Sequence, residues 1–221
     1  MNRGCFIKGT SLACFYLFTC LMATNTWALS ACGSGSYANL ELFSNTGGAS
    51  FSVDWGVCGD NELEMKMTAN GTGWIGVGFS EDSSMSSTDI VMGGVDASGN
   101  GYLIDTWASD RSSPGVDTSQ DYVLVSSSEI AGSTIIEFTR SLNTGDLDDY
   151  DLDDGVGMYL LWAMGAADYT GGRSDYHSGS RGISTATIDF GISSVPVPAA
   201  VWLMGTAVLG LAGMRHKKAT V

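Results

Sequence analysis

Histidine is nearly absent from this chain of 221 residues, which contains only two, and proline is scarce at three. His216 lies in the basic segment RHKK near the C-terminus, so imidazole chemistry in a folded domain depends on His177 alone. No CxxC or CxxCH motif occurs, which disfavours a thiolate zinc site and covalent haem attachment. Residues 29–194 also lack any amphipathic helical stretch, and no helix is predicted there.

Positive charge is scarce as well, with ten Lys and Arg against 24 Asp and Glu. All of the acidic residues, but only half of the basic ones, lie between residues 29 and 194. Such a surface repels phosphate backbones, so nucleic acid is a poor partner. An acidic surface can instead steer cationic partners, although solubility alone is the commoner explanation.

The N-terminal residues 1–28 have the layout of a secretory signal peptide. They begin MNR, continue through the apolar run SLACFYLFTCLMA and end at the small-residue site TWA. This layout predicts export and cleavage near Ala28. A lipoprotein site at LSAC is the alternative, but the polar stretch TNTWA separates it from the apolar run.

The C-terminal residues 195–221 begin with an uncharged segment of about 20 residues, which as a helix reaches about 30 Å, the hydrocarbon thickness of a bilayer. RHKK follows directly, so we expect a transmembrane helix with its basic end on the cytoplasmic side. A buried core helix is the alternative. The VPVPAA start, apolar segment and basic end resemble PEP-CTERM sorting signals of the VPLPA type. That resemblance implies processing by an exosortase-type enzyme and an envelope or extracellular location in a bacterium with two membranes.

Residues 29–194 have the length of one domain with its own core. Cys5, Cys14 and Cys20 lie in the signal segment, which leaves Cys32 and Cys58. In an oxidising compartment an even pair predicts one disulfide.

Short stretches rich in β-branched and aromatic residues recur along this region between clusters of Gly, Ser, Asn and Asp. ELEMKMTA alternates polar and apolar residues, whereas GWIGVGF and YLLWAMG are continuously apolar, as in strands covered on both faces. The fold class predicted is all-β, a sandwich of roughly nine to eleven antiparallel strands. The predicted strands are ASFSVDWGV, ELEMKMTA, GWIGVGFS, DIVMGGVDA, GYLIDTWAS, YVLVSSS, STIIEFTRSL, GMYLLWAMGA and TATIDFGI.

Two residues stand in unusual surroundings for their type. Met85 lies in the loop EDSSMSS with no apolar neighbour within three positions, and His177 lies in the Gly- and Ser-rich segment SDYHSGSRG. Simple solvent exposure is the plain interpretation of each. One Met and one His without cysteine are also the axial ligand set of a low-spin, electron-transferring haem iron.

An ordered series of motifs extends from about residue 50 to residue 190: GWIGVGFSEDSSM, STDIVMGGV, GYLIDTWAS, QDYVLV, IIEFTRSLNTGDLDD, LLWAMGA and YH-x-x-x-RG. The series resembles the DOMON domain family, and within it the haem-binding branch typified by the cytochrome domain of cellobiose dehydrogenase. The resemblance implies an immunoglobulin-like β-sandwich. It also implies non-covalent haem b with Met85 and His177 as the metal ligands.

Four more residues are candidates to contact the haem that the resemblance implies. Tyr176 and Trp107 are expected to pack on the porphyrin, although aromatic residues in a sandwich are more often core. Arg173 and Arg181 flank His177 and suit charge-assisted hydrogen bonds to haem propionates. The alternative for Arg181 is a structural pairing with an Asp.

The expected function is therefore that of a b-type cytochrome domain that passes single electrons to or from a redox partner protein. No flavin, nicotinamide or copper-binding pattern is present, so no catalytic activity is expected. The alternative is a haem-free DOMON module that binds sugar or exopolysaccharide, or acts as an interaction protein of the cell envelope. The sorting tail favours a location near polysaccharide.

Overall fold

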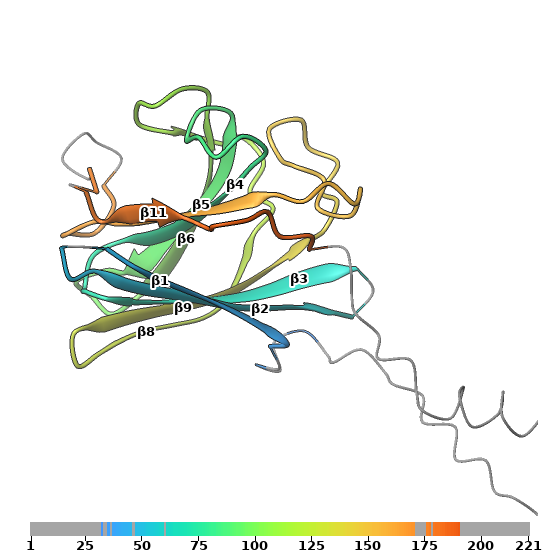
Figure 1. Cartoon of the computed structure of the whole chain (residues 1–221). Helices are drawn as coiled ribbons and strands as arrows, with labels where there is room; N and C mark the ends of the chain where they lie inside the picture. The colour runs from blue at the N-terminus through green and yellow to red at the C-terminus, as the bar shows by residue number, and fades with distance from the viewer. Residues whose placement is uncertain are drawn as a thin grey trace, which may run out of the picture.

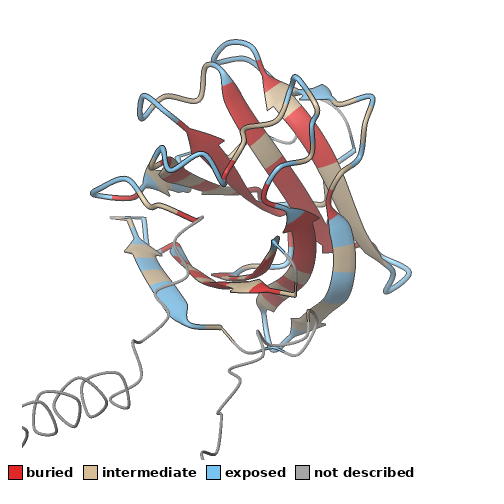
Figure 2. Ribbon diagram, turned by 90° about the vertical axis from the view of Figure 1, so that its right-hand side faces the viewer, coloured by how far each residue is buried: buried red, intermediate tan, exposed pale blue. Residues whose placement is uncertain are grey.

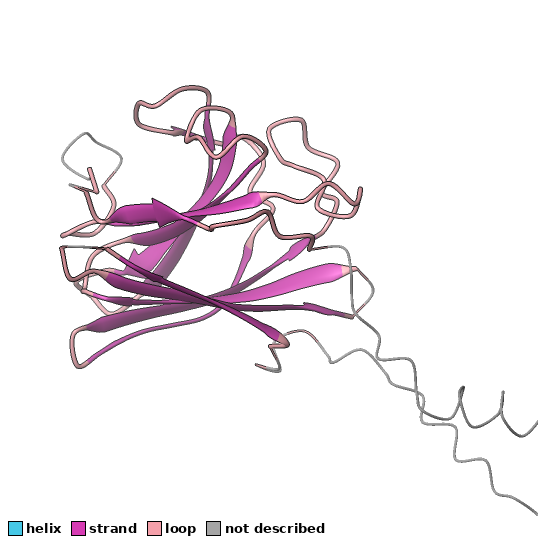
Figure 3. Cartoon of the chain, viewed as in Figure 1, coloured by secondary structure: helices cyan, strands magenta, loops and turns pink. Residues whose placement is uncertain are grey.

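A computed structural model of the chain describes residues 32, 35, 37–45, 47–59, 61–170, 176–177 and 179–190. Within these residues, eleven strands form two antiparallel sheets that pack face to face (Figure 1), and no helix occurs (Figure 3). The all-β sandwich predicted from the sequence is confirmed. No helix in the described ranges is long and apolar enough to cross a membrane.

The first sheet has five strands in the order β1-β2-β3-β9-β8. Successive neighbours pair antiparallel, and β8 contains a register shift between Leu124 and Ser126. Its strands are β1 (Asn39–Ser44), β2 (Ser50–Cys58), β3 (Glu62–Asn70), β8 (Val123–Ile130) and β9 (Ser133–Ser141).

The second sheet has six strands in the order β11-β10-β4-β5-β6-β7, and its neighbours are antiparallel too. The chain therefore crosses from one sheet to the other after β3, after β7 and after β9. The strands of this sheet are β4 (Ile75–Ser80), β5 (Thr88–Val95), β6 (Gly101–Ala108), β7 (Gly115–Val116), β10 (Tyr159–Met164) and β11 (Arg181–Ile183).

The core lies between the two sheets, where the buried stripes of facing strands meet (Figure 2). In β3, Met65 and Met67 are fully buried, which confirms the alternation of ELEMKMTA. In β4, Ile75, Val77 and Phe79 point into the core. The residues between them therefore face the outer side of the second sheet, because side chains alternate along a strand.

Three short strands were not predicted, and one predicted strand is absent. β1, β7 and β11 are the missed strands, and two of them have three residues or fewer, which is too short for a periodic pattern. Most of TATIDFGI is not a strand: Ile188 makes an isolated bridge with Met158, and Phe190 is buried in the core.

A buried ion pair joins the two sheets. Arg140 of β9 is 1% exposed, and its guanidinium lies 2.6 Å from the carboxylate of Asp89 in β5. The same guanidinium donates to the hydroxyl of Tyr122, which in turn donates to Asp89 at 2.8 Å. Asp149 lies 3.6 Å away as a second acidic partner. A cation in a protein interior is tolerated only with such partners.

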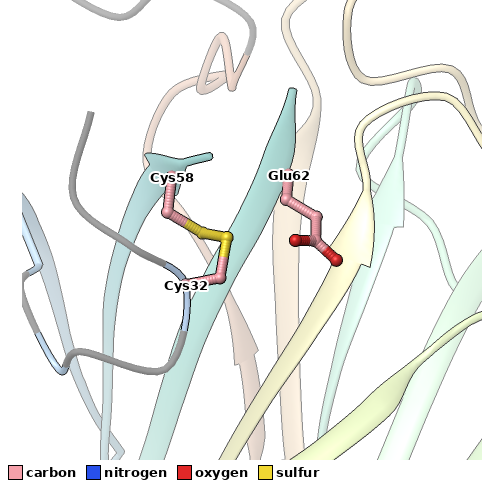
Figure 4. A group of neighbouring side chains, drawn as sticks. All are labelled: Cys32, Cys58 and Glu62. Atoms are coloured by element: carbon pink, nitrogen blue, oxygen red, sulfur yellow. A yellow bond between two sulfur atoms is a disulfide. The ribbon is translucent and has the colours of Figure 1, made fainter. Parts of the chain in front are cut away.

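Cys32 and Cys58 form a disulfide at the end of β2 (Figure 4). The bridge connects the N-terminal part of the described chain to the sandwich, beside Glu62 of β3. The predicted signal peptide at residues 1–28, the sorting tail at residues 195–221 and Arg173 lie outside the described residues.

Candidate cofactor site

A cavity of about 510 Å³ lies against the second sheet. Its volume is within the range of about 300–1,000 Å³ that is typical of ligand and cofactor sites. Gly76 and Gly78 of β4 form the middle of its floor, with Ile90 and Met92 of β5 on one side and Ala163 of β10 on the other.

The middle of the floor has no side chains because of the alternation in β4. The core-facing residues are large, whereas the outward positions between them are the glycines. A Cβ at Gly76 would lie 2.9 Å from the carbonyl oxygen of Val91, and one at Gly78 would lie 2.8 Å from a methyl carbon of Thr88. A side chain at either position would clash with β5, so both positions require glycine. The middle of the floor therefore has no side chains.

Met85 reaches the cavity from the loop between β4 and β5. The strand residues at both ends of this loop, Ser80 and Thr88, are fully buried. Both hydroxyls donate to the carbonyl oxygen of Ser84, at 2.8 and 2.7 Å respectively. These two bonds close the loop at the residue before Met85 and hold the thioether side chain at the cavity wall.

The same loop contains two strained serines. Ser83 and Ser87 have φ angles of 61° and 54°, in the left-handed region that non-glycine residues seldom adopt. Such a conformation costs about 1–3 kcal/mol and is retained where the surrounding bonds over-determine it. In this loop the surrounding bonds are the two from the buried hydroxyls of Ser80 and Thr88 to the Ser84 carbonyl oxygen.

His177 reaches the same cavity from the segment before β11. Its ring centroid lies 4.3 Å from that of Tyr176, and Arg181 Nη1 lies 3.2 Å from its Nδ1. The same Arg181 nitrogen donates to the Tyr176 hydroxyl at 3.1 Å. Because guanidinium has no acceptor, Nδ1 accepts this hydrogen bond and the ring proton is on Nε2.

Burial of the imidazole lowers the pKa of His177 to about 4, and the charge of Arg181 acts in the same direction. The ring is therefore neutral at physiological pH. A neutral imidazole has the lone pair that a metal requires.

The cavity thus brings together Met85, His177, Tyr176 and Arg181, all of which the sequence singled out. A thioether and a neutral imidazole line one cavity whose floor has Gly76 and Gly78 at its middle, between apolar side chains of β5 and β10. This donor set suits a haem iron held between sulfur and nitrogen, and it lacks the carboxylate ligands that calcium or magnesium prefer.

The family model of the DOMON domain matches residues 48–165, more than half of the chain. The chain belongs to the DOMON domain family. Met85 lies inside the matched part, whereas His177 and Arg181 follow it.

The curated relatives of this DOMON chain are longer proteins. DBH-like monooxygenase protein 1 of Homo sapiens is 34% identical over 68% of this chain, which covers 24% of that protein. The Mus musculus protein of the same name is 35% identical over 59% of this chain, or 21% of its own length. The chain therefore spans less than a quarter of these two relatives.

Cytochrome domains are among the solved structures to which this chain is similar. The cytochrome domain of Myriococcum thermophilum cellobiose dehydrogenase has a TM-score of 0.50 at 16% identity, covering 76% of this chain and 89% of that one. The cytochrome b domain of Coprinopsis cinerea pyranose dehydrogenase has a TM-score of 0.49 at 19% identity, covering 68% and 81%. At 16% identity, the similarity to the Myriococcum thermophilum domain shows a shared fold and no more.

Trp107 is not where the sequence interpretation placed it. It pairs with Asp89 across β5 and β6, so both side chains lie on the same, inward face of the sheet. Asp89 on that face binds Arg140, and the Trp107 ring packs 5.7 Å from that of Tyr150. Trp107 is not part of the cavity lining, so the structure does not bring it together with Met85 and His177.

One charged residue of the cavity was missed. Arg111, in the loop between β6 and β7, lines the cavity together with the neighbouring Pro114. It lies far from both His177 and Met85 in the sequence, and SDRSSPG has the composition of an ordinary polar loop. Only the folded sheet places this loop beside the glycine floor.

Proposed function

We propose that this DOMON domain binds one haem b non-covalently and transfers single electrons. The observation that carries the proposal is that Met85 and His177, from separate loops, line one cavity. The cytochrome domain with a similar fold supports it, although that likeness alone shows only the architecture. Bound haem would supply a reversible one-electron iron couple.

In this proposal Met85 provides the thioether ligand and His177 the imidazole ligand. If Met85 and His177 both held the iron, the bound haem would have no open position for oxygen or a substrate. The domain would therefore exchange electrons with a redox partner protein and would have no catalytic site of its own. Thioether ligation also stabilises the ferrous state and raises the potential.

Three residues near His177 complete the proposed site. Tyr176, 61% exposed, packs beside the imidazole at the cavity edge. Arg181 also lines the cavity and is suited to a propionate carboxylate. Arg173, four residues before His177 in the sequence, is also proposed to bind a propionate carboxylate.

We propose further that the domain works outside the cytoplasm, at the envelope of a bacterium with two membranes. The signal peptide predicted at residues 1–28 and the sorting signal predicted at residues 195–221 are the basis for this location. The tail would anchor the protein at least transiently in the inner membrane until an exosortase-type enzyme processes it.

The test is the absorption spectrum of the full chain produced with haem supplied. We expect sharp α and β bands on reduction, which Met85→Ala and His177→Ala each abolish. His216→Ala, outside the domain, is the matched histidine control, and Met65→Leu, in the core strand β3, is the matched methionine control. A wild-type protein that takes up no haem would refute the proposal.

A second candidate function is sugar binding without haem. The aromatic side chains of Trp74, Tyr169 and Tyr176 line the cavity, and such rings stack on sugar faces. Exopolysaccharide is the proposed ligand because of the sorting tail. Glycan binding by a protein that takes up no haem, and loss of that binding in Tyr176→Ala, would favour this function; a protein with neither ligand would fit an interaction module.

A further inference from the structure

The positively charged residues of the described part of the chain fall into two groups. Lys66 pairs with Asp54 at 3.0 Å, and Arg140 pairs with buried carboxylates in the core. Arg111 and Arg181 form no ion pair with a carboxylate of the described residues, and both line the cavity. In a chain with a net charge of −14, the two arginines without a carboxylate partner therefore meet at one apolar cavity.

Arg111 is not neutralised by its own neighbour. The carboxylate of Asp110 accepts a hydrogen bond from the backbone nitrogen of Ser112 at 2.6 Å. Ser113 and Pro114, which line the cavity close to Arg111, are uncharged. The Arg111 guanidinium is exposed and available to an anionic group of a ligand.

Arg181 becomes available when His177 binds a metal. Its present partners are the Tyr176 hydroxyl and the lone pair on Nδ1 of His177. A neutral imidazole that binds iron through Nε2 carries its proton on Nδ1, and one that binds through Nδ1 has used that lone pair. In either case Nδ1 no longer accepts from Arg181, so the guanidinium is released toward another acceptor.

The two arginines approach the cavity from opposite margins of the sheet. Arg181 begins β11, which is one edge strand, and Arg111 follows β6, with three strands between them in the order β11-β10-β4-β5-β6. Two cations on opposite sides of one cavity fit two separate anionic groups better than a single one. The cavity lining between them includes the apolar side chains of Ile90, Met92 and Leu161, which suit the apolar body of such a ligand.

We propose that Arg111 and Arg181 form a two-sided clamp that selects a flat apolar ligand with two carboxylates, each arginine binding one of them. This inference rests on the proposed function, in which the two carboxylates are the propionates of haem, and it assigns Arg111 as a specificity residue. Charge-assisted bonds from arginine to carboxylate are strong and are lost when the carboxylate is esterified.

The test uses metal-free protoporphyrin, which isolates the contribution of Arg111, because Arg181 is released from His177 only when a metal is bound. Its binding to the full chain, and that of its dimethyl ester, are measured by fluorescence titration. We expect wild type to bind the dicarboxylate about tenfold or more tightly than the ester. Arg111→Gln should lose most of this preference by weakening dicarboxylate binding about tenfold, while ester binding stays unchanged.

Matched variants separate clamping from general effects. Lys66→Gln removes an equal charge that is already paired with Asp54, and it should leave both affinities unchanged. Arg111→Lys should keep part of the preference, since the charge remains and the forked donor is lost. Because Arg111 is exposed, the thermal midpoint of Arg111→Gln should equal that of wild type.

Several outcomes overturn the inference. Equal binding of dicarboxylate and ester by wild type would do so, as would an Arg111→Gln protein with unaltered dicarboxylate affinity. The proposed function fails separately: haemin that binds without a low-spin Met and His spectrum would contradict axial ligation while the porphyrin preference survives. Absence of binding by haemin and both porphyrins would contradict the two together.

Discussion

The Thr88 hydroxyl donates to the carbonyl oxygen of Ser84 at 2.7 Å, and this bond ties the first residue of β5 to the residue before Met85. Thr88 is fully buried, so the bond is protected from water. The position of the proposed sulfur ligand therefore depends on the hydroxyl of a residue that is not part of the cavity lining.

Removing that hydroxyl should weaken sulfur ligation. Thr88→Val keeps the shape of the side chain but leaves the Ser84 carbonyl with the Ser80 bond alone. We expect haem that is still bound but partly high-spin, seen as broadened α and β bands, and a lower reduction potential. Thr88→Ser restores the donor and should restore the spectrum. An unchanged spectrum and potential in Thr88→Val would show that the loop does not depend on this bond.

Filling the cavity should block binding without unfolding the domain. Ala163 of β10 lies directly opposite Gly76 of β4 and lines the cavity. Ala163→Phe places a ring above the floor, so porphyrin and haem affinity should fall about tenfold or more by titration. Trp107→Phe, on the inward face, should leave affinity unchanged. Loss of binding in the Trp107 variant alone would contradict the assignment of the two faces.

The buried carboxylate of Asp105 should make stability fall as pH rises. Desolvation, and then the charge of Asp89, raise the pKa of Asp105 from 3.8 to about 8. A carboxyl whose folded pKa is raised stabilises the fold fully below about pH 4, and the contribution is lost as pH rises through about 8.

Asp105→Asn tests this dependence. The amide oxygen can still accept from the Asp121 backbone nitrogen, as the carboxylate does at 3.1 Å. Urea denaturation should show the variant to be more stable than wild type by about 1–3 kcal/mol near pH 8, with the difference shrinking toward pH 5. A stability difference that is the same at both pH values would contradict titration of the Asp105 carboxyl as its cause.

The ion pair of Arg140 with Asp89 should be far more important for stability than the surface pair of Lys66 with Asp54. Arg140→Met leaves Asp89 buried without its cation, which costs about 3–5 kcal/mol. Lys66→Met removes a partly exposed pair worth about 0–1 kcal/mol. Chemical denaturation of both variants measures the comparison, and comparable losses would show that the buried pair is not holding the sheets together.

Much of the fold could be predicted because each strand carries its own local pattern. Met65 and Met67 alternate with polar residues in β3 and are fully buried. The continuously apolar β4 and β10 are neighbours within the second sheet, covered by the core on one face and lining the cavity on the other. Strands of two or three residues, such as β7 and β11, have no period to detect and form only because a longer neighbour offers an open edge.

For the candidate site, the sequence by itself determined that Met85 and His177 lie in polar loop segments, where a methionine or a lone histidine is unusual. It could not determine the face of Trp107, because in β6 the buried side includes Asp105, a residue type that hydrophobic patterning assigns to solvent. The buried Asp105 carboxylate accepts from the backbone nitrogen of Asp121, which the fold brings to it from 16 residues further along the chain. Arg111 reaches the cavity for a similar reason. The order of strands in the sheet decides which loops border Gly76 and Gly78, and that order depends on contacts between residues far apart in the sequence.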